Sequence, residues 1–175
     1  VGMGLPYAND PVVPDLAFGL PIPDDVAVLA AKRTDAQPTV VGVTGMSYYD
    51  ARGWPMQDQA RYDLYVQRLT NLTARLIRNG YGVRMLVGDV WCDRRTVDDI
   101  VAALGAEGVQ PAPGQLVAEP IYTVTELLRE IAQVDIVVSS RLHPIIFGLL
   151  LDKPAVSIAY NQKNDSVMRA VGLDA

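Results

Sequence analysis

The stretch from Ile136 to Ile146 reads Ile-Val-Val-Ser-Ser-Arg-Leu-His-Pro-Ile-Ile and decides the fold. Its first three residues form a β-branched run, which is typical of a strand covered on both faces in a parallel sheet. Ser139 or Ser140 is a suitable N-cap for a following helix, and Pro144 suits the first helical turn, which needs no N–H from it. The stretch therefore predicts a buried strand that passes directly into a helix.

Two side chains of this stretch are candidates for chemistry. Arg141 and His143 follow the predicted strand, and His143 is the only histidine in the chain. Open α/β sheets bind anions at the carboxyl ends of their strands, where the backbone amides of helix N-termini point outward. We therefore predict a site for an anionic ligand around Arg141 and His143.

Composition limits the possible functions. The chain has 175 residues, half of them hydrophobic, which is enough to bury one full core, and we expect one domain with an appended segment. Its net charge of −5 argues against a nucleic-acid partner, which normally requires a basic stripe. Cys92 is the only cysteine, so a disulfide framework and a cysteine zinc site are excluded. We expect a cytoplasmic setting, in solution or at the inner face of the membrane, since no run is apolar enough to span one.

The first 37 residues are rich in proline, which disfavours regular structure. We interpret residues 1–37 as an interdomain connector and residues 38–175 as the α/β domain. Within the connector, Leu16 and Phe18 are expected to contact the main body, and the segment from Ala27 to Ala31 is expected to add a short strand or turn.

Strand and helix patterns alternate along the rest of the chain. The predicted strands cover 39–44, 82–88, 116–118, 136–138 and 155–159. The predicted helices cover 58–79, 97–104 with Asp93 or Thr96 as cap, 124–131 with a capping box of Thr123 and Glu126, 165–171, and the helix that extends through Leu150. This alternation predicts an α/β fold with a Rossmann-like, doubly wound parallel sheet.

Three loops are expected to meet at the carboxyl edge of this sheet: 45–54, 139–143 and 160–163. They offer two kinds of side chain, positive or proton-bearing groups and neutral donors: Arg141, His143 and Lys163, then Ser47, Tyr48, Ser139, Ser140 and Tyr160. This set suits an anion with two separated charged groups. Each charged residue also has a structural interpretation, in which the arginine pairs with a carboxylate, the histidine closes a helix terminus and the lysine is solvated.

Two segments together resemble a known family. Residues 139–143 read Ser-Ser-Arg-Leu-His before an apolar helix, and residues 152–163 read Asp-Lys-Pro-Ala-Val-Ser-Ile-Ala-Tyr-Asn-Gln-Lys. This pattern resembles the C-terminal domain of the polysaccharide pyruvyl transferase family, and residues 14–18 resemble its interdomain segment. The resemblance implies a GT-B-like arrangement, in which two Rossmann-like domains face each other across a cleft and the C-terminal half binds phosphoenolpyruvate.

The resemblance also implies roles for individual residues. Arg141, Leu142 and His143 would surround the phosphate of phosphoenolpyruvate, and Tyr160 and Lys163 would line the same pocket. The implied reaction transfers pyruvate to two sugar hydroxyls as a ketal in cell-surface polysaccharide biosynthesis. His143 is the best acid for its proton step, and Lys163 could hold the donor carboxylate. Neither a metal nor a further cofactor is required.

The saccharide acceptor is expected to bind to a partner domain. Because the chain begins at Val1 and not at a methionine, we interpret it as a fragment that lacks this N-terminal acceptor domain. The fragment is therefore expected to bind the donor weakly and to catalyse no turnover.

One departure from the family pattern leaves two other classes open. Met46 stands where some members have an arginine, and Arg52 lies further along the same loop. A GT-B glycosyltransferase would bind a nucleotide sugar at the same edge, with Asp165 as the nearby acidic residue for a ribose. A non-catalytic module would keep the fold for ligand or partner binding, which the methionine at position 46 favours.

Overall fold

The computed structural model describes residues 14–32, 37–158 and 162–173. Within these residues, five parallel strands form one sheet in the order β3-β2-β1-β4-β5. The strands are β1 (Val40–Thr44), β2 (Gly82–Leu86), β3 (Leu116–Val117), β4 (Ile136–Ser139) and β5 (Ala155–Ser157). The predicted Rossmann-like parallel sheet is confirmed, and its order reverses between β1 and β4, the position at which such sheets bind ligands.

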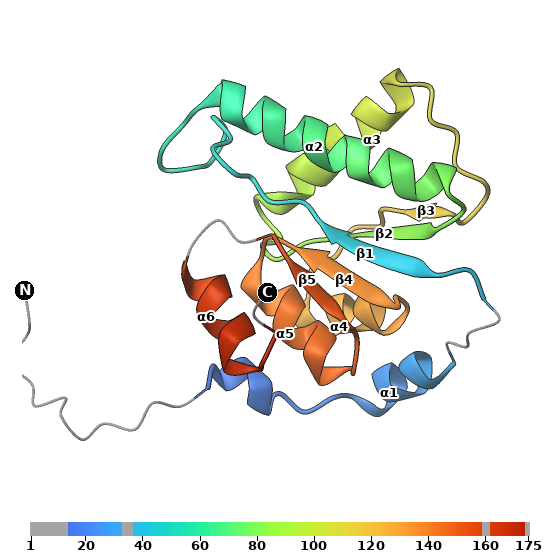
Figure 1. Cartoon of the computed structure of the whole chain (residues 1–175), viewed down its shortest axis with the longest axis vertical. Coiled ribbons are helices and arrows are strands. Elements are labelled where there is room, and N and C mark those ends of the chain that lie inside the picture. The colour runs from blue at the N-terminus through green and yellow to red at the C-terminus, as the bar shows by residue number, and fades with distance from the viewer. Residues whose placement is uncertain (1–13, 33–36, 159–161, 174–175) are drawn as a thin grey trace, which may run out of the picture.

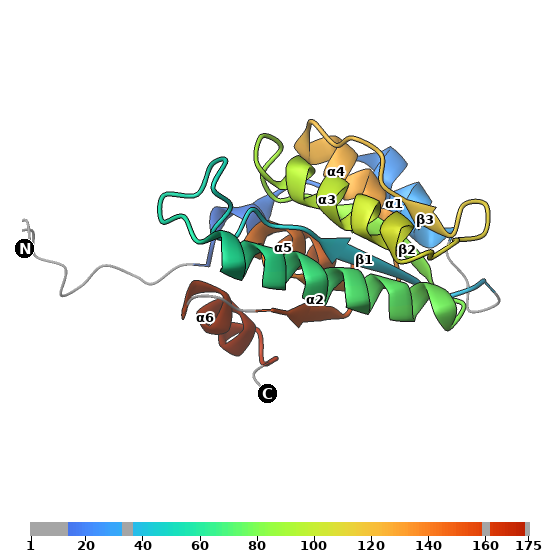
Figure 2. The same cartoon turned by 90° about the horizontal axis from the view of Figure 1, so that it is seen from above.

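Helices cover both faces of the sheet. The helical elements are η1 (Leu16–Gly19), α1 (Asp24–Ala31), α2 (Gln59–Arg78), α3 (Asp93–Ala106), α4 (Val124–Ala132), α5 (Leu142–Leu150) and α6 (Gln162–Ala170). On one face α2 packs against α3, and on the other α4 lies between α1 and α5, with η1 against α5 (Figure 1). Figure 2 shows α6 beside β5, at the opposite edge of the sheet from β3.

The predicted helix 58–79 is confirmed by α2. Asp58 is its N-cap and accepts the backbone N–H of Arg61 at 3.1 Å. Its apolar stripe faces the core, where Tyr62 and Ile77 are buried. Gly80 ends the helix in the left-handed conformation, with φ of +82°, which a glycine adopts at little cost.

Of the predicted helix caps, the capping box of α4 is confirmed. The Thr123 hydroxyl accepts the N–H of Glu126, and the Glu126 carboxylate accepts the N–H of Thr123. This reciprocal pair satisfies two backbone donors that the helix itself leaves without partners.

The predicted caps of α3 and α5 are wrong. The N-cap of α5 is Arg141, because Ser139 still belongs to β4 and Ser140 lies between them. The Ser139 hydroxyl accepts the N–H of Arg141 at 2.9 Å and donates to its carbonyl oxygen at 2.7 Å, so it shapes the turn before the helix. The N-cap of α3 is Cys92, and Asp93 is the first helical residue, with its carboxylate engaged elsewhere.

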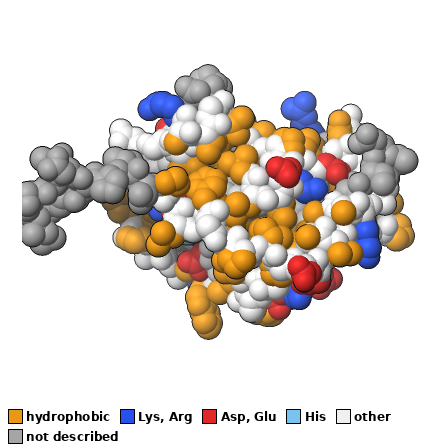
Figure 3. Space-filling view, turned by 90° about the horizontal axis from the view of Figure 1, so that it is seen from below, with side chains coloured by type: hydrophobic (Ala, Val, Ile, Leu, Met, Phe, Trp, Pro, Cys, Tyr) orange, Lys and Arg blue, Asp and Glu red, His pale blue; other side chains and the backbone are white. Residues whose placement is uncertain are grey.

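The described part of the connector packs on the core. Instead of the predicted strand or turn, the segment forms α1, whose Asp24 and Asp25 suit the positive end of a helix dipole. Phe18 packs against the core as predicted, whereas Leu16 is 90% exposed. In a 3₁₀ turn, residues two positions apart point in different directions. Leu16 of η1 and Val28 of α1 are both exposed. Figure 3 shows hydrophobic side chains spread over the face of the molecule that carries η1 and α1.

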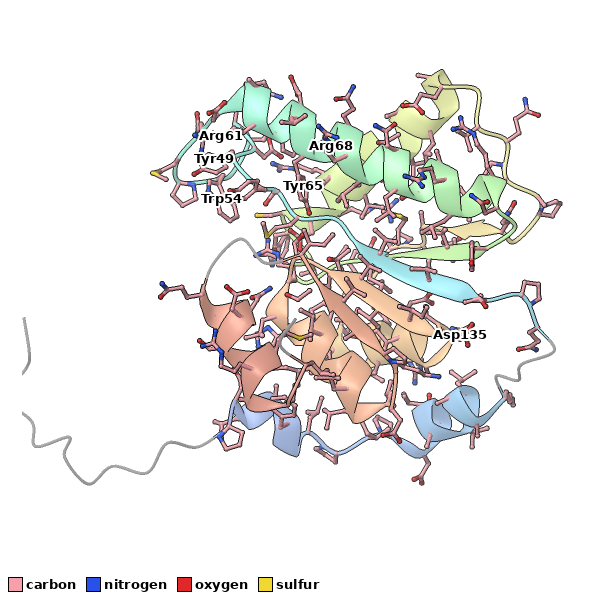
Figure 4. All side chains as sticks on the ribbon, viewed as in Figure 1. Tyr49, Trp54, Arg61, Tyr65, Arg68 and Asp135 are labelled. Carbon is pink, nitrogen blue, oxygen red and sulfur yellow. The ribbon has the colours of Figure 1, made fainter. Side chains whose placement is uncertain are left out.

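Side chains join β1 to β4 at both ends of the two strands. At one end, the Asp135 carboxylate accepts the backbone N–H of Val40 at 2.8 Å. At the carboxyl end, the Thr44 hydroxyl donates to the Ser139 hydroxyl at 2.9 Å. Figure 4 shows Asp135 at the end of the sheet opposite to Tyr65, which lies near the candidate site.

Candidate functional site

The carboxyl ends of β1 and β2 are joined by one buried carboxylate, that of Asp93, which has no exposed surface. This carboxylate accepts the backbone N–H of Ser47, which follows β1, at 3.3 Å. It also accepts the N–H groups of Gly88 and Asp89, which follow β2, at 3.0 and 2.9 Å. Asp93 therefore holds two strand exits in fixed positions beside the switch point of the sheet.

Asp93 also binds the guanidinium of Arg141, at the exit of β4. Nε of Arg141 lies 2.9 Å from one carboxylate oxygen and Nη2 lies 2.6 Å from the other, which makes the pair bidentate. The stem of Arg141 lies on Gly88, where an added Cβ would come within 2.6 Å of the arginine Cβ. Arg141 is thus fixed at its stem and at its head.

Sequence reasoning missed the role of Asp93, which we considered only as a helix cap. A local signal exists, because Gly88-Asp89 at a strand exit with Asp93 four residues later is a compact acidic turn. Nothing local indicates its partner, since Arg141 lies 48 residues further along the chain.

His143 is exposed on the first turn of α5 and borders an apolar cavity of about 370 Å³, which we call the His143 hollow. Its walls come from η1, the exit of β2, the start of α4 and α5, and include Leu20 and Phe147. The ring centroids of Phe147 and His143 are 6.1 Å apart. Gly88, on which the stem of Arg141 lies, also lines this hollow.

Tyr65 of α2 reaches the exit of β4. Its hydroxyl lies 3.2 Å from the hydroxyl of Ser140, and burial raises the pKa of Tyr65 to about 12. From the other side, the Asn164 amide donates to the Ser140 carbonyl oxygen at 3.1 Å, which brings α6 to the same strand exit. We did not predict either contact, because both partners are far from Ser140 in the sequence.

The residues predicted to bind substrate lie in different environments. Ser47, Ser140 and Leu142 are buried, with 3%, 1% and 8% exposure, so little of these residues is open to a ligand. Lys163 is exposed in the first turn of α6. Tyr160 lies outside the described residues.

Tyr48 belongs to an aromatic cluster in the loop after β1. Its ring centroid lies 4.6 Å from that of Tyr49, 5.8 Å from Trp54 and 5.8 Å from Tyr65. The Arg61 guanidinium lies 5.0 Å from the Tyr49 ring, and Figure 4 shows these side chains grouped at one end of the sheet. The cluster gives the loop a small core of its own next to Tyr65.

Met46 and Arg52, the two residues weighed against the family's arginine, have structural surroundings of their own. Met46 is buried, with 1% exposure, so its side chain belongs to the core. Arg52 forms ion pairs with Asp50 at 2.8 Å and with Asp99 of α3 at 2.5 Å, and it donates to the hydroxyl of Tyr62. These contacts hold Arg52 between α2 and α3, so it does not replace an arginine at position 46.

Asp165, the residue considered for a ribose, lies in the first turn of α6. It lines a separate cavity of about 430 Å³ with Ser157 of β5 and Arg169. Across residues 14–32, 37–158 and 162–173, no three His, Cys, Asp or Glu side chains are grouped so that they could hold a metal ion. Among the same residues, no helix is long and apolar enough to cross a membrane.

The parallel sheet, with a guanidinium held at its switch point, defines a Rossmann-like α/β domain. A family model described as polysaccharide pyruvyl transferase matches residues 2–162. Because this match spans most of the chain, the chain belongs to the polysaccharide pyruvyl transferase family, which indicates a transferase with a saccharide acceptor. Searches of curated proteins and of solved structures found no match.

Proposed function

We propose that this chain binds phosphoenolpyruvate at the exit of β4 and serves as the donor half of a pyruvyl transferase. The observation that carries the proposal is the placement of His143, an exposed proton donor on the first turn of α5, two residues after the fixed guanidinium of Arg141. In this proposal, the enzyme forms a ketal on a saccharide for cell-surface polysaccharide biosynthesis, without a metal or a further cofactor.

The phosphate would be held by Arg141 and by the start of α5. The first N–H groups of a helix have no intrahelical acceptors, and the helix dipole favours an anion beside them. Leu142 and His143 supply such amides, whereas Pro144 has none. Arg141 adds a planar fork that matches the geometry of phosphate oxygens.

The reaction can be written so that atoms and charges balance. The methylene carbon of phosphoenolpyruvate takes a proton from His143 and becomes a methyl group, which leaves positive charge at the adjacent carbon. One sugar hydroxyl adds at that carbon, phosphate leaves, and a second hydroxyl adds to close the ketal. The two hydroxyl protons reprotonate the histidine and the departing phosphate. General acid catalysis of this kind contributes roughly a hundred- to ten-thousand-fold in rate.

Lys163 would hold the donor carboxylate, together with Tyr160, and the acceptor would bind to a partner domain outside this chain. Lys163 lies one residue before Asn164, whose amide already contacts the exit of β4. The chain alone would then bind the donor and turn nothing over.

Calorimetric titration of the chain with phosphoenolpyruvate tests this proposal. Separate titrations with uridine and guanosine nucleotide sugars test the alternative, a glycosyltransferase. We expect the Lys163→Gln variant to lose about ten- to a hundredfold in affinity, because a charge-assisted hydrogen bond is worth about 1.5 to 3 kcal/mol. Arg75→Gln is the matched control: it also removes one positive charge, but from an exposed position in the last turn of α2. Its affinity should stay within twofold of the wild type.

The role of His143 is tested separately by the variant His143→Gln, in a protein that combines this chain with the proposed acceptor domain. Donor affinity should stay within about threefold, whereas phosphate release in the presence of acceptor should fall at least about a hundredfold. Binding of a nucleotide sugar without binding of phosphoenolpyruvate would overturn the proposal in favour of a glycosyltransferase. Binding of neither phosphoenolpyruvate nor a nucleotide sugar would favour a non-catalytic module.

A further inference from the structure

We propose that Asp93 is a positioning residue for the donor, because it sets the direction in which the Arg141 guanidinium meets an anion. This inference rests on the proposed function, in which Arg141 contacts the phosphate of phosphoenolpyruvate. It adds a residue to the site that does not itself touch the ligand.

The Asp93 carboxylate is itself immobilised. One of its oxygens accepts the N–H of Ser47, and the other accepts the N–H groups of Gly88 and Asp89. Since these amides follow β1 and β2, the carboxylate is attached to the exits of the central strand and of one of its neighbours. A partner that binds this carboxylate takes its orientation from the sheet.

Arg141 binds this carboxylate through Nε and Nη2, the side of the guanidinium. Because the group is planar and rigid, fixing one side also fixes the plane and the direction of the other N–H groups. The stem is held as well, since it lies directly against Gly88. Such fixed geometry is what lets a binding group act without reorganising when the ligand arrives.

The pair also decides how the site attracts an anion. A buried carboxylate and a guanidinium together carry no net charge, so the attraction comes from directed hydrogen bonds and from the start of α5. Binding that depends on direction more than on net charge should vary weakly with salt, because screening acts mainly on uncompensated charges. Removal of the Asp93 charge should therefore weaken the affinity and steepen its salt dependence.

The experiment compares the wild-type chain with Asp93→Asn, Gly88→Ala and Glu130→Gln. Phosphoenolpyruvate is titrated at 50 and 300 mM salt, well below the melting temperature of each variant. Glu130→Gln is the matched control, because it breaks the partly buried ion pair between Arg84 and Glu130, far from the strand exits. It should lower stability and leave donor affinity within twofold.

We expect Asp93→Asn to lose at least about tenfold in affinity at 300 mM salt, and to lose distinctly less at 50 mM salt, where its uncompensated guanidinium charge is less screened. Gly88→Ala should lose about tenfold in affinity at both salt concentrations, since it displaces the stem of Arg141 and removes neither charge. If Asp93→Asn does not fold, Gly88→Ala decides, and unchanged affinity in that variant overturns the inference.

The outcomes separate this inference from the proposal on which it rests. Wild-type binding that Asp93→Asn retains, with the same salt dependence, overturns the positioning role alone and leaves the donor assignment intact. No binding of phosphoenolpyruvate by the wild-type chain overturns the donor assignment and this inference together.

Discussion

The hydroxyl of Tyr65 and the hydroxyl of Ser140 lie 3.2 Å apart, which joins the middle of α2 to the turn between β4 and α5. Ser140 is buried and Tyr65 is half-buried, so each hydroxyl supplies a partner where access of water is restricted. The contact links the aromatic cluster of the first loop to the strand exit where the donor is proposed to bind.

Tyr65→Phe should destabilise the chain by about 1 kcal/mol, because it leaves the buried Ser140 hydroxyl without this partner. Urea unfolding followed by circular dichroism measures the change. Tyr81→Phe removes a hydroxyl from a side chain that is 39% exposed, and it should stay within about 0.5 kcal/mol of the wild type. Equal losses in the two variants would contradict the structural contact.

Alkaline pH should weaken the fold through the same tyrosine. The phenol of Tyr65 has a pKa near 10 when unfolded and about 12 in the structure, because burial disfavours the phenolate. The neutral phenol of Tyr65 contributes fully to the free energy of unfolding below pH 10. This contribution falls by roughly 2 kcal/mol as the pH rises toward 12. Urea midpoints measured at pH 8 to 12 should fall more steeply for the wild type than for Tyr65→Phe. Parallel curves would contradict the raised pKa of Tyr65.

Two helical glycines should respond to alanine with opposite sign. Gly148 of α5 lies on β4, where an added Cβ would be 2.9 Å from Cγ2 of Val137. Gly148→Ala should therefore destabilise by about 1 to 3 kcal/mol. Gly105 of α3 has nothing within 4 Å of the same position, so Gly105→Ala should stabilise by about 0.5 to 1 kcal/mol. Thermal melting of both variants measures these changes. A Gly148→Ala variant with unchanged melting temperature would mean that α5 can move away from the sheet.

The capping box of α4 gives a prediction within a single helix. Thr123→Ala should cost about 1 kcal/mol, because it removes the acceptor for the N–H of Glu126. Thr125→Ala makes the same replacement inside the helix, where alanine has the higher helix propensity, and should be neutral or slightly stabilising. Chemical denaturation of the pair tests whether the cost belongs to the cap.

Most of the fold could be predicted because its signals are local. The stripe of α2, the β-branched run of β4 and the capping box of Thr123 each lie within one element, and the structure confirms them. The turn before α5 was harder, because the hydroxyl of Ser139 bonds with the backbone of Arg141 and leaves the cap position to the arginine. That choice depends on the geometry of the strand exit.

The candidate site was predicted only as a region. Residues 139–143 do lie at the carboxyl edge, yet the carboxylate that binds Arg141 comes from α3, and the hydroxyl beside Ser140 comes from α2. Contacts between residues so distant in sequence depend on how helices pack on the sheet, which periodicity does not encode. The roles of His143 and Lys163 in binding and catalysis stay predictions.

The two clamps between β1 and β4 constrain how the protein can move. Asp135 joins the two strands at their start, and Thr44 with Ser139 joins them at their carboxyl end, so separation of the strands at either end breaks a hydrogen bond. A ligand that arrives at the seam between β1 and β4 meets two strands that are joined at both ends. We therefore expect any conformational change on its entry to occur mainly in the loops and helices at the carboxyl edge of the sheet.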